Sequence, residues 1–550
     1  MKLLILALDG FDPDLFRQWR NRLPHLNEIA QAGGFAPLRS TIPPMTFPAW
    51  STFLTGVNPG KHGIFDFTER LSGRLGVRFI NSTRRRYPTF LKLASDQGLT
   101  VGSIGLPTTY PPESLGGYQI SGFDTPLPSK ADASYVHPPD LAREINRELG
   151  GYFFGDFNES RIGRRWHRRI LNKLLQGIER KKALIQFLQR RIPVDLLLLH
   201  VGETDTVGHH YWSFCDARSP RHVPTNDAAL APAILTVYRA ADDLVGWLME
   251  FCRPDHLLIV SDHGMGGTSD RVLYLNRYLA AKDFLHPGPT SLREIAAGPV
   301  KNWGLKWIPY RWQQQAFKLA GGGLANKIES SQRFGGIDWA RTRAYSEELN
   351  YFPAIWLNLK EREPFGVVSP DQADSVLEEI RSALLEWRDP ADGAAVVKHV
   401  HRREEIYAGP EIESAPDLIL ELNQPDGYSY ALGRSRESKS FSPWCRLGPG
   451  EYIGRKGASM NGSHRPLGTF ITTAKPDLSQ GVDNLTLLDM APLALNLLGL
   501  TKPDWMEGLI NVSDQMMASP DDLARMTTKP YTSQQEALLH RRLADLGYLP

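Results

Sequence analysis

Aspartate and histidine residues follow apolar runs at several places in the chain, and together they could hold a pair of metal ions. Carboxylate oxygens and imidazole nitrogens are common ligands of catalytic divalent ions, whose coordination shell leaves one position open to substrate. The candidates are Asp9, Asp205, His209, Asp262, His263 and His464. This set of side chains favours a metal-dependent hydrolase.

Two pairs among these residues have a spacing that suits one ion. Asp205 and His209 stand four positions apart after an apolar run, so one turn of helix places both side chains on the same face. Asp262 and His263 are neighbours, and both can face an ion only where the backbone leaves its strand sharply. The glycines in Gly264–Gly267 permit such a change of direction.

A threonine supplies the candidate nucleophile. Thr46 comes two residues before Pro48, which suits the first turn of a helix, and Gly56 is placed to end that helix. A helix N-terminus presents free N–H groups and a positive dipole, which attract phosphoryl oxygens. Coordination to a divalent ion lowers the pKa of a threonine hydroxyl and makes it nucleophilic. We therefore expect Thr46 to bind metal and to attack a phosphoester.

Strands and helices that would position these residues alternate along the chain. Apolar runs typical of strands buried on both faces cover residues 3–8, 101–105, 195–201, 256–260 and 469–473. Helical patterns cover residues 15–32, 238–251 and 487–498. The alternation predicts an α/β sandwich with a mostly parallel sheet between helices. Ligands of such sheets bind outside the carboxyl ends of the strands, where Asp9, Asp205 and Asp262 stand.

Two long segments interrupt the alternation. Residues 126–191 contain a basic stretch, 161–191, with eleven Arg or Lys residues, one acid and leucines at helical spacing. Residues 276–454 carry strand patterns at 355–359 and 418–422 and are interpreted as an inserted cap or subdomain. The predicted catalytic core comprises residues 1–125, 192–275 and 455–515. Residues 516–550 form a tail with a final helix, which begins at the capping-box pattern Ser533–Glu536.

The amino-acid composition limits the kinds of binding partner and the compartment that we expect. The 63 Lys and Arg residues nearly balance the 61 Asp and Glu residues, so the net charge of +2 gives no general argument for nucleic acid or membrane. The basic stretch is interpreted as the solvated face of a surface helix, with contact to anionic substrate or lipid headgroups as the alternative. Three scattered cysteines exclude a disulfide framework. No apolar run reaches the length of a membrane span, and we expect a cytoplasmic protein with a small-molecule substrate.

The motifs together resemble a known family. Its signatures are similar to Asp9-Gly10-Phe11, Thr46-Phe47-Pro48, Thr55-Gly56 through His62-Gly63-Ile64, Asp205-x-x-x-His209, Ser261-Asp262-His263-Gly264 and Gly462-Ser463-His464. The chain thus resembles the type I phosphodiesterase/nucleotide pyrophosphatase branch of the alkaline phosphatase superfamily, and in particular a prokaryotic, largely uncharacterised subgroup.

The resemblance implies an alkaline-phosphatase-like fold and a division of the ligands between two ions. Asp205, His209 and His464 would hold one ion, and the other would be held by Asp9, Thr46, Asp262 and His263. The ions would be zinc, with manganese or iron as alternatives. Thr46 would form a phospho-threonine intermediate that water then hydrolyses.

One position departs from the family pattern. Many members place an Asn after the His-Gly-Ile element, where it contacts a phosphoryl oxygen, but this chain has Phe67. Asn81, Lys61 or backbone N–H groups could supply that contact. Supporting or structural roles are predicted for three further polar residues, which are His62, His210 and Asp66.

These observations predict a phosphodiesterase or nucleotide-pyrophosphatase-like hydrolase. The same site could serve a phosphomonoesterase or a phosphonate hydrolase. A phosphoryl transferase and a non-catalytic anion-binding protein are the remaining alternatives. The substrate and the oligomeric state are left open by the sequence.

Overall fold

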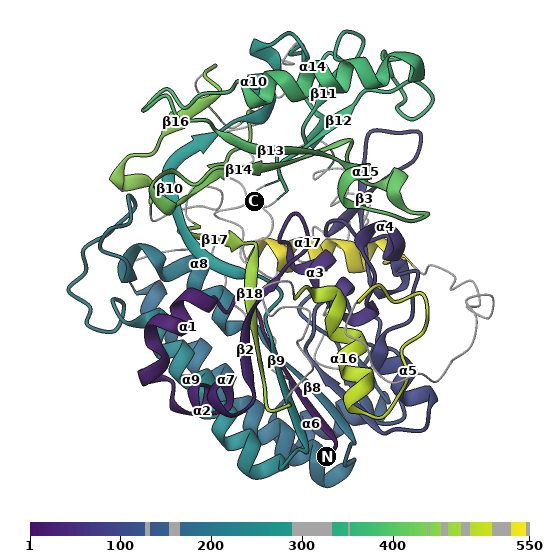
Figure 1. The fold of residues 1–550 in the computed structure, drawn as a ribbon, viewed down its shortest axis with the longest axis vertical. Coiled ribbons are helices and arrows are strands. Elements are labelled where there is room, and N and C mark those ends of the chain that lie inside the picture. Colours follow the sequence, from purple (N-terminus) through teal and green to yellow (C-terminus); the bar gives the residue numbers. More distant parts are fainter. Residues whose placement is uncertain are drawn as a thin grey trace.

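The structure is a computed structural model. It describes the chain apart from residues 127–132, 153–164, 289–329, 331–332, 350–351, 437, 439–440, 453–459, 475–484, 509–529 and 546–550. A large α/β body occupies the lower part of Figure 1, and a smaller cap lies above it.

An eight-stranded sheet forms the centre of the large body. The strand order is β2-β18-β9-β1-β8-β5-β6-β7. The strands are β1 (Leu3–Leu8), β2 (Gly34–Arg39), β5 (Val101–Ile104), β6 (Tyr118–Ile120), β7 (Val136–His137), β8 (Leu196–Val201), β9 (His256–Val260) and β18 (Leu467–Thr472). Pairings from β9 to β6 are parallel, and those at both edges are antiparallel. The predicted α/β fold with a mostly parallel sheet is confirmed.

Helices cover both faces of this sheet. One face carries α1 (Pro13–Trp19), α2 (Pro24–Ala32), α7 (Trp166–Arg191), α8 (Glu203–Cys215) and α9 (Ala233–Cys252). The other carries α3 (Thr46–Thr55), α5 (Phe90–Asp96) and α16 (Met490–Leu497). Side chains of β1 alternate between the two cores, with Leu4 and Leu6 in one and Leu3 and Ile5 in the other. The central strands are therefore buried on both sides, which explains their uninterrupted apolar sequences.

The prediction of one helix over residues 15–32 is wrong in one respect, because the segment forms two helices, α1 and α2. Pro24 lacks an N–H, and Leu23 before it adopts a non-helical conformation with φ −129° and ψ 69°. The second helix starts there, where the Asp242 carboxylate accepts the backbone N–H groups of His25 and Leu26 at 3.3 and 2.7 Å. The break depends on a distant residue as well as on the proline.

The cap has its own four-stranded sheet, in the order β11-β12-β14-β13. These strands are β11 (Ala344–Tyr345), β12 (Ala354–Leu357), β13 (Val397–Arg402) and β14 (Leu418–Leu422), and they pack with α10 (Leu275–Ala281) and α14 (Ala373–Leu385). The strand patterns at 355–359 and 418–422 correspond to β12 and β14. The division of the chain into core, insertions and tail stays a prediction.

A long strand joins the two bodies. β10 (Gly264–Leu273) starts beside the main sheet and curves up into the cap (Figure 1). It pairs with β17 (Gly462–Arg465), β15 (Ser429–Leu432) and β16 (Trp444–Arg446). The remaining helices and strands are α4 (Pro59–His62), β3 (Thr68–Arg70), β4 (Val77–Phe79), α6 (Asp140–Leu149), α15 (Arg403–Ile406) and α17 (Ser533–Asp545).

The described part of the basic stretch forms α7. Its apolar residues, among them Ile170, Leu174 and Ile185, are buried in the core. Several of its cations pair with acids, as Arg168 does with Asp227 at 2.6 Å. Lys181 contacts Glu203 at the start of α8. These contacts favour the interpretation of α7 as a surface helix that packs on the sheet. They do not favour the alternative, an exposed strip that binds anions.

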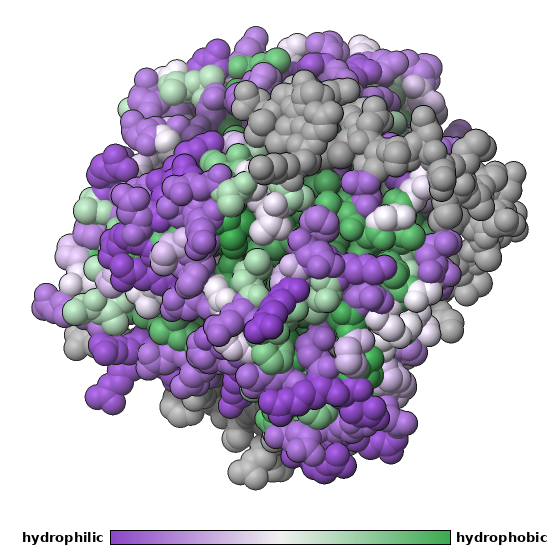
Figure 2. Space-filling model, turned by 60° about the horizontal axis from the view of Figure 1, so that its bottom comes forward, coloured by the Kyte–Doolittle hydropathy of each residue, from purple (hydrophilic) through white to green (hydrophobic). Residues whose placement is uncertain are grey.

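The described surface gives no sign of a membrane span. Most of the face shown in Figure 2 is hydrophilic. Within the described ranges, no helix combines the length and the apolar character needed to cross a lipid bilayer.

Candidate metal centre

The six candidate Asp and His ligands meet above the carboxyl ends of β9, β1 and β8. Asp9 directly follows β1, and Asp262 and His263 form the link between β9 and β10. Asp205 lies in the first turn of α8 with His209 one turn later. β17 pairs antiparallel with β10 and brings in His464. All six residues are buried.

The first group comprises Asp205, His209 and His464. Asp205 Oδ1 lies 3.1 Å from His209 Nε2 and 3.5 Å from His464 Nε2. The two Nε2 atoms are 3.1 Å apart. The helical spacing of Asp205 and His209 therefore places both side chains at one point, as predicted.

The second group comprises Asp9, Asp262 and His263. His263 Nε2 lies 3.5 Å from Asp9 Oδ1 and 3.3 Å from Asp262 Oδ2. The His263 ring stacks on the His464 ring with centroids 3.6 Å apart. Potential ligand atoms of His263, His464 and Asp205 also lie within 4.8 Å of one another. His263 thus stands between the two groups.

Hydrogen bonds determine which imidazole nitrogens carry lone pairs. Nδ1 of His209 lies 2.8 Å from Gly462 O, Nδ1 of His464 lies 2.8 Å from Pro44 O, and Nδ1 of His263 lies 3.0 Å from Gly264 O. A carbonyl oxygen only accepts, so each Nδ1 donates its hydrogen. In its unprotonated form, each ring then directs an Nε2 lone pair toward the centre.

Protons or a cation can offset the negative charge gathered here. Although burial lowers it, the charge and hydrogen bond of Asp205 raise the pKa of His209. Burial, and after it the charges of Asp9 and Asp205, raise the pKa of Asp262 well above its usual range. Burial and the neighbouring His464 lower the pKa of His263 to about 3, so this ring is neutral near pH 7. The donor set suits divalent cations, which bind neutral imidazole and carboxylate together.

Residues on either side of Thr46 contact one member of each group. It is the first residue of α3, whose N-cap residue is Met45, so Thr46 does not cap this helix. Two contacts place the start of α3: Pro44 O accepts from His464, and Trp50 Nε1, one turn after Thr46, donates to Asp9 Oδ2 at 3.2 Å. The Thr46 Oγ1 atom is buried and has no hydrogen-bond partner within the described chain.

Asp9 is held by two side chains that the sequence did not point to. His200 Nε2, from β8, lies 2.9 Å from Asp9 Oδ2, which also accepts from Trp50. The other oxygen, Oδ1, faces His263. One oxygen of Asp9 is therefore fixed by the protein while the other is directed into the centre. The signal available in the sequence was a histidine inside an apolar strand, and the register places it opposite Ala7, two positions before Asp9.

We predict that His200→Leu weakens metal binding by roughly 10–100-fold, because supporting partners orient a ligating carboxylate. Dialysis against metal buffers followed by elemental analysis measures this loss. His200→Gln is the matched control, since its amide can still donate to Asp9. Equal affinities for wild type and His200→Leu would show that Asp9 does not depend on His200.

The residues considered for the oxyanion contact lie in different places. Phe67 packs its ring against Phe47, the neighbour of Thr46, with centroids 4.4 Å apart, so this position is aromatic. Lys61 pairs with Glu507 at 2.7 Å, and Glu507 N donates to Gly56 O at the far end of α3. Since ten helical residues span about 15 Å, the alternative in which Lys61 contacts the phosphoryl group is not supported.

Asn81 and the three residues with predicted supporting roles have structural contacts. Asn81 Oδ1 accepts from Thr83 N and Oγ1 at 3.0 and 2.7 Å. His62 links Thr52 and Ile64 within the core. The His210 ring packs edge-on against Trp166. Asp66 contacts Arg333 of the cap at 3.3 Å.

The α/β fold and the Asp and His side chains gathered above its strand ends suit a hydrolase with a possible metal site. Residues 3–437 match the model of the type I phosphodiesterase/nucleotide pyrophosphatase family. The chain belongs to this family. The likeness to a prokaryotic subgroup stays a prediction.

Curated relatives match about half of the chain. A venom phosphodiesterase of Crotalus adamanteus is 26% identical over 303 residues, which are 52% of this chain and 30% of the relative. The human ectonucleotide pyrophosphatase/phosphodiesterase family member 1 is 24% identical over 295 residues, which are 50% of this chain and 25% of the relative. The chain therefore covers less than a third of the length of these relatives.

One solved structure is similar over most of the chain. The phosphonoacetate hydrolase of Sinorhizobium meliloti, in complex with phosphonoacetate, superposes with a TM-score of 0.52 at 17% identity and covers 90% of this chain and 95% of its own. This likeness supports the fold alone.

Proposed function

We propose that this family member hydrolyses phosphoesters, with diesters or pyrophosphates as its preferred class, through Thr46 at a two-metal site. The main observation behind the proposal is that potential metal-ligand atoms of six side chains converge. Three Nε2 atoms and the carboxylates of Asp9, Asp205 and Asp262 face one another within 3.1–3.5 Å contacts. Divalent ions bound among these atoms would offset the charge of the carboxylates and supply the chemistry for which the family is named.

The proposed ligand sets follow the two groups. Asp205, His209 and His464 would hold one ion. Asp9, Thr46, Asp262 and His263 would hold the other. Zinc is the first candidate, and manganese and iron suit the same donors. Bound ions would neutralise phosphoryl oxygens, lower the pKa of the Thr46 hydroxyl and stabilise the departing oxygen.

Thr46 would act at the N-terminus of α3. The N–H groups of Thr46 and Phe47 open this helix and suit a phosphoryl oxygen. Thr46 Oγ would form a bond to phosphorus while the ester bond to the leaving oxygen breaks. The alcohol or phosphate would leave in this first step. Water would then cleave the bond between Thr46 Oγ and phosphorus, which releases the remaining phosphomonoester and restores the Thr46 hydroxyl. Asn81 is the proposed oxyanion contact in place of the family's Asn.

A substrate panel tests this proposal. Metal-loaded protein is assayed with bis-para-nitrophenyl phosphate, para-nitrophenyl phosphate, a phosphonate ester and para-nitrophenyl sulfate. We expect the phosphodiester to be cleaved fastest. If the monoester or the phosphonate is cleaved faster, the protein is a phosphomonoesterase or a phosphonate hydrolase. If no substrate is cleaved with zinc, manganese or iron, the results support a non-catalytic anion-binding protein.

Metal affinity should rise with pH. Because burial and the charges of Asp9 and Asp205 raise the pKa of Asp262, its carboxyl binds a proton more readily than a free aspartate does, and a cation must compete with that proton. Lowering the pH therefore favours the proton over the metal, by up to about tenfold in affinity per pH unit for one proton. Competition with a chromogenic chelator between pH 5 and 8 measures the slope, and a flat profile would contradict this reading of Asp262.

The proposed location is cytoplasmic. The cysteines Cys215, Cys252 and Cys445 are all free thiols, which suits a reducing compartment.

A further inference from the structure

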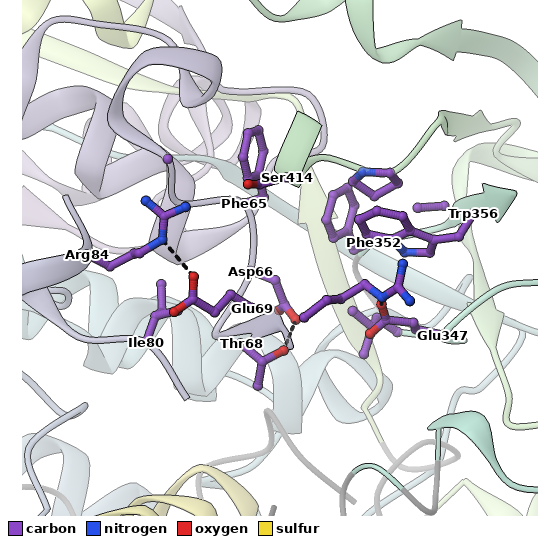
Figure 3. Close-up of a pocket in the computed structure, with 15 residues that line it drawn as sticks. Phe65, Asp66, Thr68, Glu69, Ile80, Arg84, Glu347, Phe352, Trp356 and Ser414 are labelled. Atoms are coloured by element: carbon purple, nitrogen blue, oxygen red, sulfur yellow. Dashed lines mark hydrogen bonds and ion pairs between the residues drawn. The ribbon is translucent and has the colours of Figure 1, made fainter. Parts of the chain in front are cut away.

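The main body and the cap meet at a pocket beside Asp66 and along strand β10. None of the proposed metal ligands lines the pocket (Figure 3). β10, in contrast, begins directly after Asp262 and His263. Its second residue, Met265, is buried and is the register partner of His464 in β17. Met265 therefore lies between residues of both ligand groups.

The backbone of Met265 is held by the segment that carries Asp9. Asp12 Oδ2 accepts the Met265 N–H at 3.2 Å, and Asp12 Oδ1 accepts two N–H groups of the first turn of α1. The Asp12 N–H donates to the Tyr238 hydroxyl of α9 at 3.0 Å. Because both oxygens and the amide of Asp12 are engaged, Met265 is fixed to the segment after β1 as well as to β17.

The side chain of Met265 lies against Gly208, the neighbour of His209 in α8. A Cβ atom added at Gly208 would lie 2.5 Å from Met265 Cγ and 3.1 Å from its Sδ and Cε atoms, so either Met265 or α8 would have to move. A glycine inside a helix lowers stability by roughly 0.5–1 kcal/mol relative to alanine. Gly208 therefore weakens α8 but leaves room for Met265.

A second glycine brings β17 close to α8 at the same point. A Cβ atom at Gly462 would overlap the Gly208 carbonyl oxygen. The Gly462 carbonyl accepts from His209 Nδ1 at 2.8 Å. Directly opposite residues of an antiparallel pair have their side chains on the same face, so Met265 and His464 both face α8 here. The helix and both strands thus meet one residue before His209.

We propose that Met265 is a positioning residue that sets the distance between the two ion sites. This assignment rests on the proposed two-metal function. Through Asp12 the backbone of Met265 is fixed to the second ligand group, and its side chain holds α8, which carries two ligands of the first group, at the depth that Gly208 permits. The ions of two-metal hydrolytic sites lie about 3.5–4 Å apart, so a small shift of α8 against β10 would separate them.

Substitutions at Gly208 and Met265 test the contact between these residues. Gly208→Ala adds a methyl group that displaces Met265, and Met265→Ala removes the side chain. The double variant Gly208→Ala/Met265→Ala has neither the overlap nor an empty space of full size. Met265→Leu keeps a side chain of similar volume. Met490→Ala, at a buried methionine in the core on the opposite face of the sheet, is the matched control.

Bound ions give the readout. In electron paramagnetic resonance of Mn²⁺-loaded protein, two nearby ions give an exchange-coupled signal that separate ions lack, and chelator competition measures the affinity for each Zn²⁺ ion. We expect wild type, Met265→Leu and Met490→Ala to show the coupled signal. Gly208→Ala and Met265→Ala should lose it and bind the second ion roughly 10–100-fold more weakly, as when partners that orient metal ligands are removed. If only zinc binds, the zinc affinities decide.

The double variant shows whether the two residues act through their contact. Because the added methyl group no longer meets Met265 Cγ, we expect the double variant to bind the second ion more tightly than Gly208→Ala does. Losses of affinity that simply multiply would mean that the two sites act independently, and would overturn the proposal.

A purely structural Met265 gives a different result. Met265→Ala would then lower Tm and leave the ion pair unchanged, as we expect of Met490→Ala. A coupled pair with wild-type affinities in Gly208→Ala or Met265→Ala would refute the positioning role, while the two-metal hydrolase would stand. If one of these variants does not fold, the other decides in the same way. A wild type that retains fewer than two ions of either metal would refute the two-metal function, and this inference with it.

Discussion

Thr46→Ala should lower kcat for phosphodiester cleavage by about 10³-fold or more, because loss of a nucleophile removes the covalent step itself. The same change should leave the fold intact. Thr46 Oγ1 is buried without a hydrogen-bond partner in the described chain, so its removal deletes an unsatisfied polar group and is expected to be neutral or slightly stabilising in the metal-free protein.

Steady-state kinetics and thermal unfolding of the metal-free protein check the two halves of this prediction. Thr46→Ser keeps a hydroxyl and is the matched control, with kcat expected within about tenfold of wild type. Acid-stable labelling by a radioactive diester should appear in wild type and be lost in Thr46→Ala. Unchanged turnover in Thr46→Ala would exclude Thr46 as the nucleophile.

The two pairs of candidate ligands could be recognised in the sequence because the proximity within each pair has a local cause. Asp205 and His209 depend only on helical spacing, and Asp262 and His263 depend on a glycine-rich exit from a strand. The uninterrupted apolar runs likewise predicted β1, β8 and β9, since a strand buried on both faces needs apolar residues throughout. The structure therefore brings together residues whose types and spacing could be recognised in the sequence.

What could not be predicted depends on contacts between distant segments. His200 supports Asp9 through the register of β1 against β8, which no local pattern encodes. The break at Pro24 depends on Asp242, more than two hundred positions away. Lys61 looked available for a phosphate, but its partner Glu507 lies near the other end of the chain. The pocket beside Asp66 arises only where cap and core meet.

His263→Ala tests the metal pair most directly, because His263 stands between both ligand groups. Its Nε2 lies 3.5 Å from Asp9 Oδ1 and 3.3 Å from Asp262 Oδ2, and its ring stacks on His464. We expect the retained divalent ions to fall from about two per chain to one or fewer. Turnover should fall roughly 10²–10⁴-fold, since the ions stabilise transition-state charge by several kcal/mol.

The difference in thermal stability between His263→Ala and wild type should change sign when metal is added. In the metal-free protein the substitution removes one of several acceptors that repel one another, so its Tm should equal or exceed that of wild type. With metal present, wild type should be the more stable, because an ion at 100 times its Kd contributes about 2.7 kcal/mol. The exposed His399→Ala is the control and should follow wild type in both states. If His263→Ala keeps two ions and the wild-type order of Tm values, the acceptors face one another for another reason, and the metal-dependent mechanism loses its main support.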